Sequence, residues 1–306
     1  MPPTTLNDLT DTPLPLLPPR APDSHKGNFG RAILIGGSRG MSGAIAMAGK
    51  SALRSGAGLA TLAVPLAVQD VVASIEPSYM THPLADTEGH IADSAADAAL
   101  ALTVDATAVA LGPGISRSRG TANFVERLYR EVMQPMVADA DALFALAERL
   151  AALNGPRAPR ILTPHPGEFE RLTGTLPDNE HRTEAAANFA AKCDGDSDAD
   201  AASSTSGKNE TIIVLKGHNT VVTDGRRFSL NRTGNPGMAT GGSGDVLTGI
   251  ITALLCQGLA PFDAARLGVH VHGLAGDMAA EALGQVSMIA SDLIEYLPQA
   301  FRAIPS

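Results

Sequence analysis

The segment from Gly234 to Gly258, GNPGMATGGSGDVLTGIITALLCQG, combines an anion-binding backbone with a carboxylate. Three glycines within four residues leave successive backbone N–H groups unshielded by side chains. The apolar run from Val246 predicts a helix directly after them, which puts these N–H groups at the positive end of a helix dipole. We therefore expect an anion hole made of Gly241, Gly242, Ser243 and Gly244.

Asp245 follows this run of glycines directly. A carboxylate is unexpected in a simple anion site because it repels phosphate, but it is well placed as a general base beside a phosphate that is being transferred. The alternative is that Asp245 or Ser243 merely caps the helix. Three glycines exceed what a cap needs, so we interpret the segment as a phosphoryl-transfer site with Asp245 as its catalytic residue.

A second candidate contact lies in the turn after the apolar run at residues 211–215. A Lys-Gly turn followed by hydrogen-bonding side chains can hold a ribose or a phosphate group. An ordinary β-turn would explain the same residues, and the turn alone does not decide between the two. The residues concerned are Lys216, Gly217, His218, Asn219 and Thr220.

Acidic and imidazole side chains follow two further expected strands. In the segment TPHPGE, Glu168 could hold a Mg²⁺ ion through water, and His165 could contact a substrate. The same segment could instead be a proline-stiffened turn into a helix, with Glu168 in the favourable first turn. Asp139, at a strand end, is a candidate site residue, whereas Asp141 is expected to cap the following helix.

These segments lie at the ends of short apolar runs that alternate with helical segments. Such runs are typical of a mostly parallel sheet covered on both faces, in which ligands bind beyond the carboxyl ends of the strands. We also expect a helix over residues 43–55, a hairpin around residues 224–225, and mainly helix from Asp245 onward. The expected strands are 31–35, 59–64, 107–111, 136–139, 160–163, 211–215, 220–223 and 226–230.

Neither of the two commonest nucleotide-binding patterns follows any of these strands. The dinucleotide fingerprint G-x-G-x-x-G is absent there, and so is the complete Walker A pattern. If the chain binds a nucleotide, it must therefore use a different device, such as the glycines before Asp245.

Composition and charge limit the class of protein. The 306 residues are 44% hydrophobic and 18% charged, with a net charge of −9 and no cluster of Lys and Arg, so we expect a globular protein that does not bind nucleic acid. Cys193 and Cys256 suggest neither a disulfide framework nor a metal site. No apolar run is long enough to span a bilayer, and the N-terminus lacks a signal-peptide pattern, so we expect a cytoplasmic protein without membrane contact.

The sequence predicts one domain over residues 25–306. We expect residues 1–24, which are rich in proline, to form an extended arm in front of it. The polar, low-complexity stretch 193–209, CDGDSDADAASSTSGKN, predicts a flexible surface insertion. No internal repeat or linker divides the remainder.

Several motifs from about His25 to the last expected helix occur in the order of one known family. They are HKGNFGRAILIGG, GMSGA, LRSGAGLATLAVP, LGPG, VADADAL, TPHPGEFERLTG, VLKGHNTVV and NPGMATGGSGDVLTGI. On these motifs the chain resembles the ADP/ATP-dependent NAD(P)H-hydrate dehydratases of the ribokinase-like superfamily. The resemblance implies an α/β fold with a central, mostly parallel sheet flanked by helices on both faces.

The resemblance also implies a reaction. Its substrate is hydrated NADH or NADPH, with a hydroxyl at C6 of the nicotinamide ring, which ADP or ATP phosphorylates in the presence of Mg²⁺. The ring nitrogen then expels phosphate and restores the reduced cofactor. By resemblance Asp245 is the base, Gly244 and the Lys216–Thr220 turn contact the nucleotide, and Glu168 organises Mg²⁺ and phosphate. The positions expected to contact the hydrated cofactor are Ala44, Gly114, His165 and Asp245.

We expect ADP-dependent (S)-NAD(P)H-hydrate dehydration, giving AMP and phosphate, because prokaryotic members of the family use ADP. The choice between ADP and ATP cannot be read from these residues. The resemblance further implies a homotetramer. The 24 residues before His25 are too few for the epimerase domain that many members carry, so a separate epimerase is expected as a functional partner.

Two other functions stay open. One is a ribokinase-like kinase that acts on a small alcohol such as a vitamin precursor, against which the GMSGA segment and His165 argue. The other is a non-catalytic nucleotide-sensing module, which would need the binding loops but not Asp245.

Overall fold

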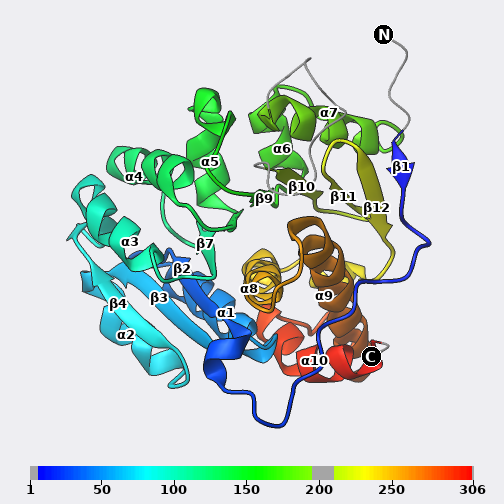
Figure 1. Cartoon of the computed structure of the whole chain (residues 1–306), viewed down its shortest axis with the longest axis horizontal. Helices are drawn as coiled ribbons and strands as arrows, with labels where there is room; N and C mark the ends of the chain where they lie inside the picture. The colour runs from blue at the N-terminus through cyan, green and yellow to red at the C-terminus, as the bar shows by residue number, and fades with distance from the viewer. Residues whose placement is uncertain (1–5, 195–209, 305–306) are drawn as a thin grey trace.

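The computed structural model describes residues 6–194 and 210–304 (Figure 1). Its main sheet has ten strands in the order β1-β12-β11-β10-β9-β8-β7-β2-β3-β4. Neighbouring strands are parallel except at β10–β11 and β11–β12, so the predicted mostly parallel sheet is confirmed. The strands are β1 (Asn7–Asp8), β2 (Arg31–Ile35), β3 (Leu59–Pro65), β4 (Met80–Leu84), β7 (Ala108–Leu111), β8 (Met136–Ala138), β9 (Arg160–Leu162), β10 (Thr211–Leu215), β11 (Thr220–Thr223) and β12 (Arg227–Asn231). The short strands β5 (Asp86–Thr87) and β6 (His90–Ile91) form a separate antiparallel pair.

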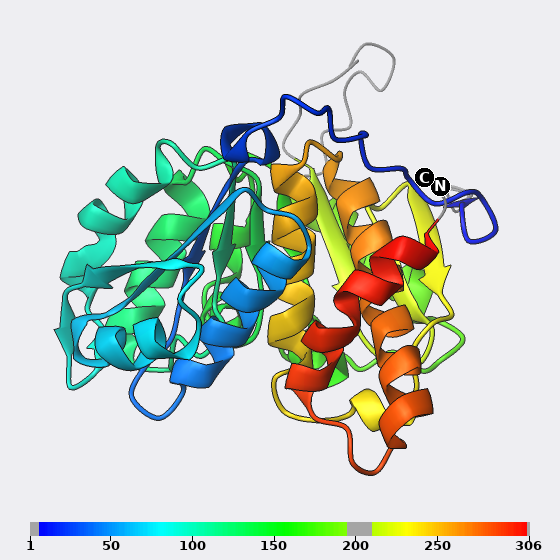
Figure 2. The same cartoon turned by 90° about the horizontal axis from the view of Figure 1, so that it is seen from below.

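Helices cover both faces of the sheet, as Figures 1 and 2 show. One face carries α1 (Ser42–Arg54), α2 (Gln69–Ile75), α8 (Ser243–Cys256), α9 (Pro261–Leu283) and α10 (Ala290–Ala303). The other carries α3 (Ala96–Thr103), α4 (Arg119–Glu131), α5 (Asp141–Ala147), α6 (Pro166–Thr173) and α7 (Arg182–Asp194). Short 3₁₀ turns lie at Lys26–Phe29, Leu66–Val68, Asp93–Ala95, Leu150–Leu153 and Pro236–Met238.

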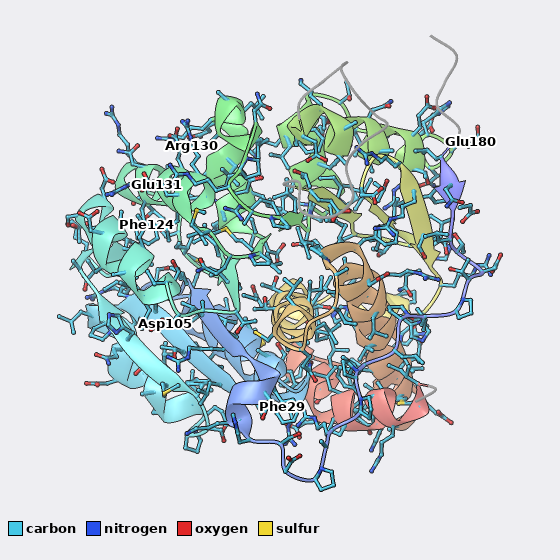
Figure 3. The ribbon with its side chains drawn as sticks, in the orientation of Figure 1. Phe29, Asp105, Phe124, Arg130, Glu131 and Glu180 are labelled. Carbon is cyan, nitrogen blue, oxygen red and sulfur yellow. The ribbon has the colours of Figure 1, made fainter. Side chains whose placement is uncertain are left out.

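Side chains along each strand point alternately to the two faces of the sheet, and they pack into two separate hydrophobic cores. In β2, Leu34 packs into the core beneath α1 and α8, whereas Ile33 and Ile35 pack into the core beneath α4 and α5. Figure 3 shows side chains filling the space between sheet and helices, and the labelled Phe124 of α4 is fully buried there. The strands are continuous apolar runs because both of their faces are covered.

The eight strands expected from the sequence are all present, and the hairpin around residues 224–225 joins β11 to β12. The helix expected over 43–55 is α1, and the C-terminal part is helical as expected. Strand β4 was not expected from the sequence, because its residues MTHPL include Pro83 and the half-exposed Met80. A strand at the edge of a sheet tolerates proline and solvent, so it lacks the apolar run that marks the central strands.

Part of the expected N-terminal arm is fastened to the sheet. Its strand β1 pairs with β12, and the buried Arg266 of α9 donates hydrogen bonds to the carbonyl oxygens of Leu9, Thr12 and Pro13. Residues 1–5 of this arm, and residues 195–209 of the expected insertion, lie outside the described residues. Among the described helices, none is long and apolar enough to cross a membrane.

Close contact between α1 and α8 sets the position of the glycine-rich segment. A Cβ on Gly249 of α8 would lie 2.0 Å from Ser51 Oγ and 2.1 Å from Ala48 O, so the two helices approach at a distance that only glycine permits. The N-terminus of α8 therefore lies at the carboxyl edge of the sheet. Gly49–Ser51 (GKS) lies inside α1 and is not part of a phosphate-binding loop.

Candidate active site

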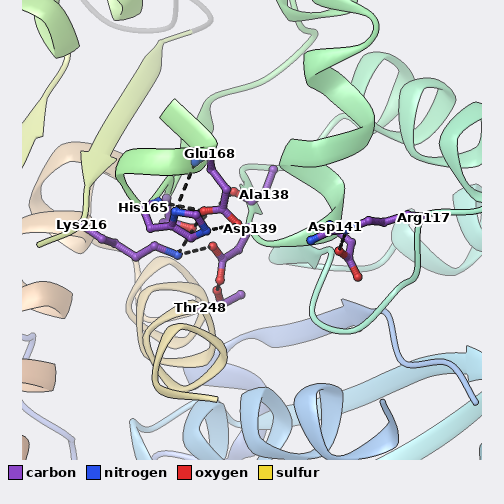
Figure 4. Close-up of polar contacts among 9 residues, drawn as sticks. Arg117, Ala138, Asp139, Asp141, His165, Glu168, Lys216 and Thr248 are labelled. Carbon is purple, nitrogen blue, oxygen red and sulfur yellow. Dashed lines mark hydrogen bonds and ion pairs between the residues drawn. The ribbon is translucent and has the colours of Figure 1, made fainter. Parts of the chain in front are cut away.

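The buried Asp139 and the partly buried Lys216 form an ion pair at the carboxyl edge of the sheet (Figure 4). Asp139 follows β8, and its Oδ1 lies 2.8 Å from Lys216 Nζ, directly after β10. Thr248 Oγ1 of α8 donates to Asp139 Oδ2 at 2.9 Å. Burial alone would raise the pKa of Asp139, but the Lys216 ammonium and the hydroxyl hydrogen bonds hold it below its usual value. Asp139 is therefore ionised at neutral pH.

His165 and Glu168 lie on the other side of Lys216 (Figure 4). Together they cap α6: His165 Nδ1 accepts from the Glu168 N–H at 3.2 Å, and Glu168 Oε2 accepts from the His165 N–H at 2.8 Å. The same Oε2 lies 3.7 Å from Lys216 Nζ. Burial raises the pKa of Glu168 and lowers that of His165. The alternative of a proline-stiffened turn into a helix is thus confirmed, and it places both side chains beside the ion pair.

Asp245 is the third residue of α8. The N-cap residue of this helix is Gly242, and no side chain caps it, so the alternative that Ser243 or Asp245 is a cap is wrong. Within the described residues the Asp245 carboxylate accepts no hydrogen bond. Burial, reinforced by the Asp139 carboxylate, raises the pKa of Asp245 to about 7 against the attraction of Lys216. A carboxylate with this pKa is matched to proton abstraction near neutral pH.

The backbone before Asp245 has unpaired donors. Across the described part of the chain, the N–H groups of Gly241, Gly242 and Gly244 have no protein acceptor, whereas that of Ser243 donates to Thr240 O at 3.4 Å. A Cβ on Gly244 would lie 3.3 Å from Lys216 Nζ and 3.4 Å from Asp139 Oδ2. The glycines thus bring free N–H groups next to the ion pair, which is the arrangement that an anion requires.

A cavity of about 630 Å³ opens between the Lys216–Thr220 turn, the segment 231–244 and helix α9. This volume is in the range of small-molecule sites. Of the expected site residues, the structure brings the following to its wall: His165, Lys216, Gly217, His218, Asn219, Thr220, Ser243 and Gly244. All six expected nucleotide contacts therefore face one cavity.

Ala44 and Gly114 lie outside this cavity. They are next to each other, because a Cβ on Gly114 would lie 3.0 Å from Ala44 Cβ and 2.6 Å from Met41 O. Gly114 has a φ of 60°, a conformation that favours glycine. Asp245, Gly241 and Gly242 also do not line the cavity. Of the four expected substrate positions, only His165 therefore lines the cavity, and Ala44 and Gly114 adjoin each other outside it.

Two residues that the sequence did not single out organise the cavity wall. His272 of α9 donates from Nε2 to Ser243 O at 2.9 Å, and burial lowers its pKa to about 4, so its ring is neutral. Asp277 of α9 accepts from the Gly234 N–H and from Asn235 Nδ2. These two residues follow the loop that they hold by about 30 to 40 positions in the sequence. Such a separation leaves no local sequence motif, so only the fold reveals their role.

Asp141 does not cap its own helix, so that expectation is wrong. The N-cap residue of α5 is Ala140, and the Asp141 carboxylate instead accepts from Arg117 Nε at 2.7 Å and from the Ser116 N–H at 3.2 Å. Figure 4 shows this pair beside the Asp139 cluster without a hydrogen bond to it. Asp141 therefore fastens the loop that follows Gly114.

The arrangement as a whole is suited to phosphoryl transfer. Free N–H groups and an ammonium lie where negative charge would be stabilised, and a carboxylate with a pKa of about 7 lies beside them. Among the described residues, no group of three or more His, Cys, Asp or Glu side chains could hold a metal ion.

The fold and the site define a ribokinase-like protein. Its architecture matches that of a ribokinase-like superfamily protein from Enterococcus faecalis V583 with a TM-score of 0.77 and 26% identity, covering 94% of this chain and 91% of that one. The ADP/ATP-dependent NAD(P)H-hydrate dehydratase from Bacillus subtilis, co-crystallised with ATP/Mg²⁺, matches with a TM-score of 0.73 and 30% identity, covering 94% and 95% of the two chains.

Sequence comparison shows which family within this class the chain belongs to. The family model for NAD(P)H-hydrate dehydratase matches residues 32–299. The bifunctional NAD(P)H-hydrate repair enzyme Nnr of Moorella thermoacetica is 44% identical over 291 residues, which are 94% of this chain and 52% of that protein. The chain belongs to the NAD(P)H-hydrate dehydratase family, and it spans about half the length of the curated relatives it matches.

Proposed function

We propose that this chain catalyses the ADP-dependent dehydration of (S)-hydrated NADH and NADPH, releasing NAD(P)H, AMP and phosphate. The observation that carries the proposal is the Asp245 carboxylate, which is partly buried, accepts no hydrogen bond from the described residues, and has a pKa of about 7 beside free N–H groups. Family membership supplies the substrate class.

In the proposed reaction, Asp245 removes the proton from the C6 hydroxyl of the hydrated nicotinamide ring. The hydroxyl oxygen attacks the terminal phosphorus of the nucleotide, and AMP leaves when the donor is ADP. The ring nitrogen then expels phosphate, and loss of a proton from the neighbouring carbon restores the dihydronicotinamide. The chain must therefore stabilise charge on the transferred phosphoryl group, which is the role we assign to the anion hole.

We assign the nucleotide to the 630 Å³ cavity. Lys216–Thr220 and Gly244 would contact it, and Gly241, Gly242 and Ser243 complete the anion hole. The hydrated cofactor would reach Asp245 from the side of Ala44 and Gly114, with His165 between the two ligands. Because Ala44 and Gly114 lie outside the cavity to which we assign the nucleotide, the two ligands would use different residues.

The residues suit a Mg²⁺ ion that is held mainly by nucleotide phosphates and water. Glu168 is the carboxylate that would contact such an ion through water, since its Oε2 already accepts the His165 N–H. Mg²⁺ commonly binds in this way, with few protein ligands. The ion would offset the charge of the phosphates.

The proposal also covers features for which resemblance is the only support. We propose one catalytic domain over residues 25–306 and a cytoplasmic homotetramer. A tetrameric mass in solution scattering would support the assembly, and a monomeric mass would refute it.

The direct test is incubation of the protein with hydrated NADH, Mg²⁺ and either ADP or ATP. We expect the absorbance of the reduced nicotinamide to return, with one phosphate released for each NADH formed and a higher rate with ADP. A kinase of the same fold would accumulate a phosphorylated product without releasing phosphate. That outcome, or no reaction with either nucleotide, would contradict the proposal.

A further inference from the structure

Arg182, the first residue of α7, spans the gap between its helix and the Lys216–Thr220 turn. Its guanidinium donates to His218 O at 2.8 Å from one terminal nitrogen, and to Lys216 O at 2.9 Å and Leu215 O at 3.2 Å from the other. The side chain is partly buried, and burial lowers its pKa, although it stays far above neutral pH. One rigid, charged group thus holds three backbone carbonyl groups of this segment in place.

The contacts of Arg182 account for the carbonyl groups on one side of the turn. The carbonyl of Gly217 accepts from Thr220 Oγ1 at 3.0 Å. The turn is held in an unusual shape, since Gly217 has a φ of 139° and Asn219 has a φ of 54°. A Cβ on Gly217 would lie 3.0 Å from a terminal nitrogen of Arg182, so the glycine is what lets the guanidinium approach.

Three N–H groups of the same turn differ from these carbonyl groups, because they have no hydrogen-bond partner among the described residues. Within the described residues, those of Gly217, His218 and Asn219 have no protein acceptor, and all three residues line the cavity. Successive free N–H groups in a turn bind anions and ligand hydroxyls well, provided that the turn is held rigid. Two carbonyl groups of the turn, those of Lys216 and His218, are therefore bound by Arg182, while its free N–H groups are available to a ligand.

We propose that Arg182 is a positioning residue of the nucleotide site: it orients the Lys216–Thr220 turn so that its free N–H groups hold the ribose and phosphates of ADP. This inference rests on the proposed function for the identity of the nucleotide. The arginine acts through the turn, and the hydrated cofactor is bound by other residues. Its loss should therefore weaken nucleotide binding without weakening hydrate binding.

The experiment compares Arg182→Met, Arg182→Lys and the wild type, with Lys192→Met as a matched control on the exposed part of the same helix. The dissociation constant for ADP is measured by titration calorimetry, and KM is measured for ADP and for hydrated NADH. We expect the ADP dissociation constant to rise about 10- to 100-fold in Arg182→Met and by less in Arg182→Lys, which keeps one or two donors. KM for the hydrate and all values for Lys192→Met should stay within about twofold.

Different outcomes separate the inference from the proposed function. An Arg182→Met protein that binds ADP as the wild type does would overturn the inference and leave the function standing. Equal losses for ADP and hydrate would indicate a general structural role and would also overturn it. If Arg182→Met does not fold, the Arg182→Lys protein decides in the same way. A wild type that binds ADP but does not turn over the hydrate would refute the proposed function alone, and one that binds neither ADP nor ATP would refute both.

Discussion

Asp139 and Asp245 stand on either side of Gly244, yet their surroundings give them opposite properties. Asp139 is paired with Lys216 and hydrogen-bonded by Thr248, and its pKa is lowered. Asp245 is partly buried and has no such partners among the described residues, and its pKa is raised to about 7. When two neighbouring carboxylates have pKa values that are pushed apart, one is suited to hold charge and the other to exchange a proton. Of the two carboxylates, Asp245 is therefore the one whose pKa suits the base that we propose.

The two carboxylates also depend on each other. The Asp139 charge is one cause of the raised pKa of Asp245, and Lys216 counteracts it. Lys216 remains protonated because its neighbouring carboxylates, Asp139 first, outweigh the effect of burial on its pKa. Removing either carboxylate should therefore change the pKa of the other.

The largest effect is expected for Asp245→Asn. Losing a general base should lower kcat by about 10²- to 10⁴-fold, whereas the affinity for ADP should change little because the N–H groups remain. Steady-state kinetics and calorimetry measure the two quantities. Undiminished turnover would refute the role of Asp245, and loss of ADP binding would show that the residue belongs to the nucleotide site.

The same substitution should stabilise the folded protein at high pH. The pKa of Asp245 is higher in the folded protein than its usual value, so the protonated carboxyl contributes to the free energy of unfolding. This contribution is complete below about pH 4 and is lost as the pH rises through about 7. At pH 8, Asp245→Asn should raise the free energy of unfolding by on the order of 2 kcal/mol. Denaturant unfolding at pH 5 and pH 8 tests this, and equal effects at the two values would contradict it.

Asp139→Asn should act in the opposite sense on stability. It leaves the buried Lys216 ammonium without its closest partner, at a cost of about 3 kcal/mol in unfolding free energy at neutral pH. Denaturant unfolding measures the change. Thr248→Val, which removes one hydrogen bond to the same carboxylate, is the matched control and should cost about 1 kcal/mol. A smaller loss for Asp139→Asn than for Thr248→Val would show that the ion pair does not organise the site.

The dependence of rate on pH should follow Asp245. Since the base must be ionised, kcat/KM for the hydrate should rise with pH and level off above an apparent pKa of about 7. In Asp139→Asn this midpoint should move to lower pH, because a negative charge has been removed near Asp245. An unchanged midpoint in that variant would mean that another group controls the profile.

The smallest effect is expected for Gly244→Ala. The added methyl would lie 3.3 Å from Lys216 Nζ, close to the free N–H groups, so KM for ADP should rise about threefold to tenfold with little change in stability. Gly43→Ala is the matched control, because Gly43 is the second residue of α1 as Gly244 is of α8, and a Cβ there meets nothing within 4 Å. Equal effects of the two substitutions would contradict a special role for Gly244.

The sequence predicted the parts of this site that depend on local chemistry. Glycines before an apolar run must give free N–H groups at a helix start, and apolar runs such as Thr211–Leu215 must be buried strands. The relations between distant segments could not be predicted in the same way. The pairing of Asp139 with Lys216 spans 77 residues, and Arg182 and His272 contact backbone carbonyls, which accept from almost any donor and leave no pattern in the sequence.

The raised pKa of Asp245, on which the proposed proton transfer depends, can be measured directly. Titration of ¹³C-labelled aspartate carboxyl groups by NMR, with Asp245→Asn to assign the resonance, should show one carboxyl that titrates near pH 7 and disappears in the variant. Asp139 should titrate below its usual range in the same protein. An Asp245 resonance that titrates near pH 4 would contradict the account.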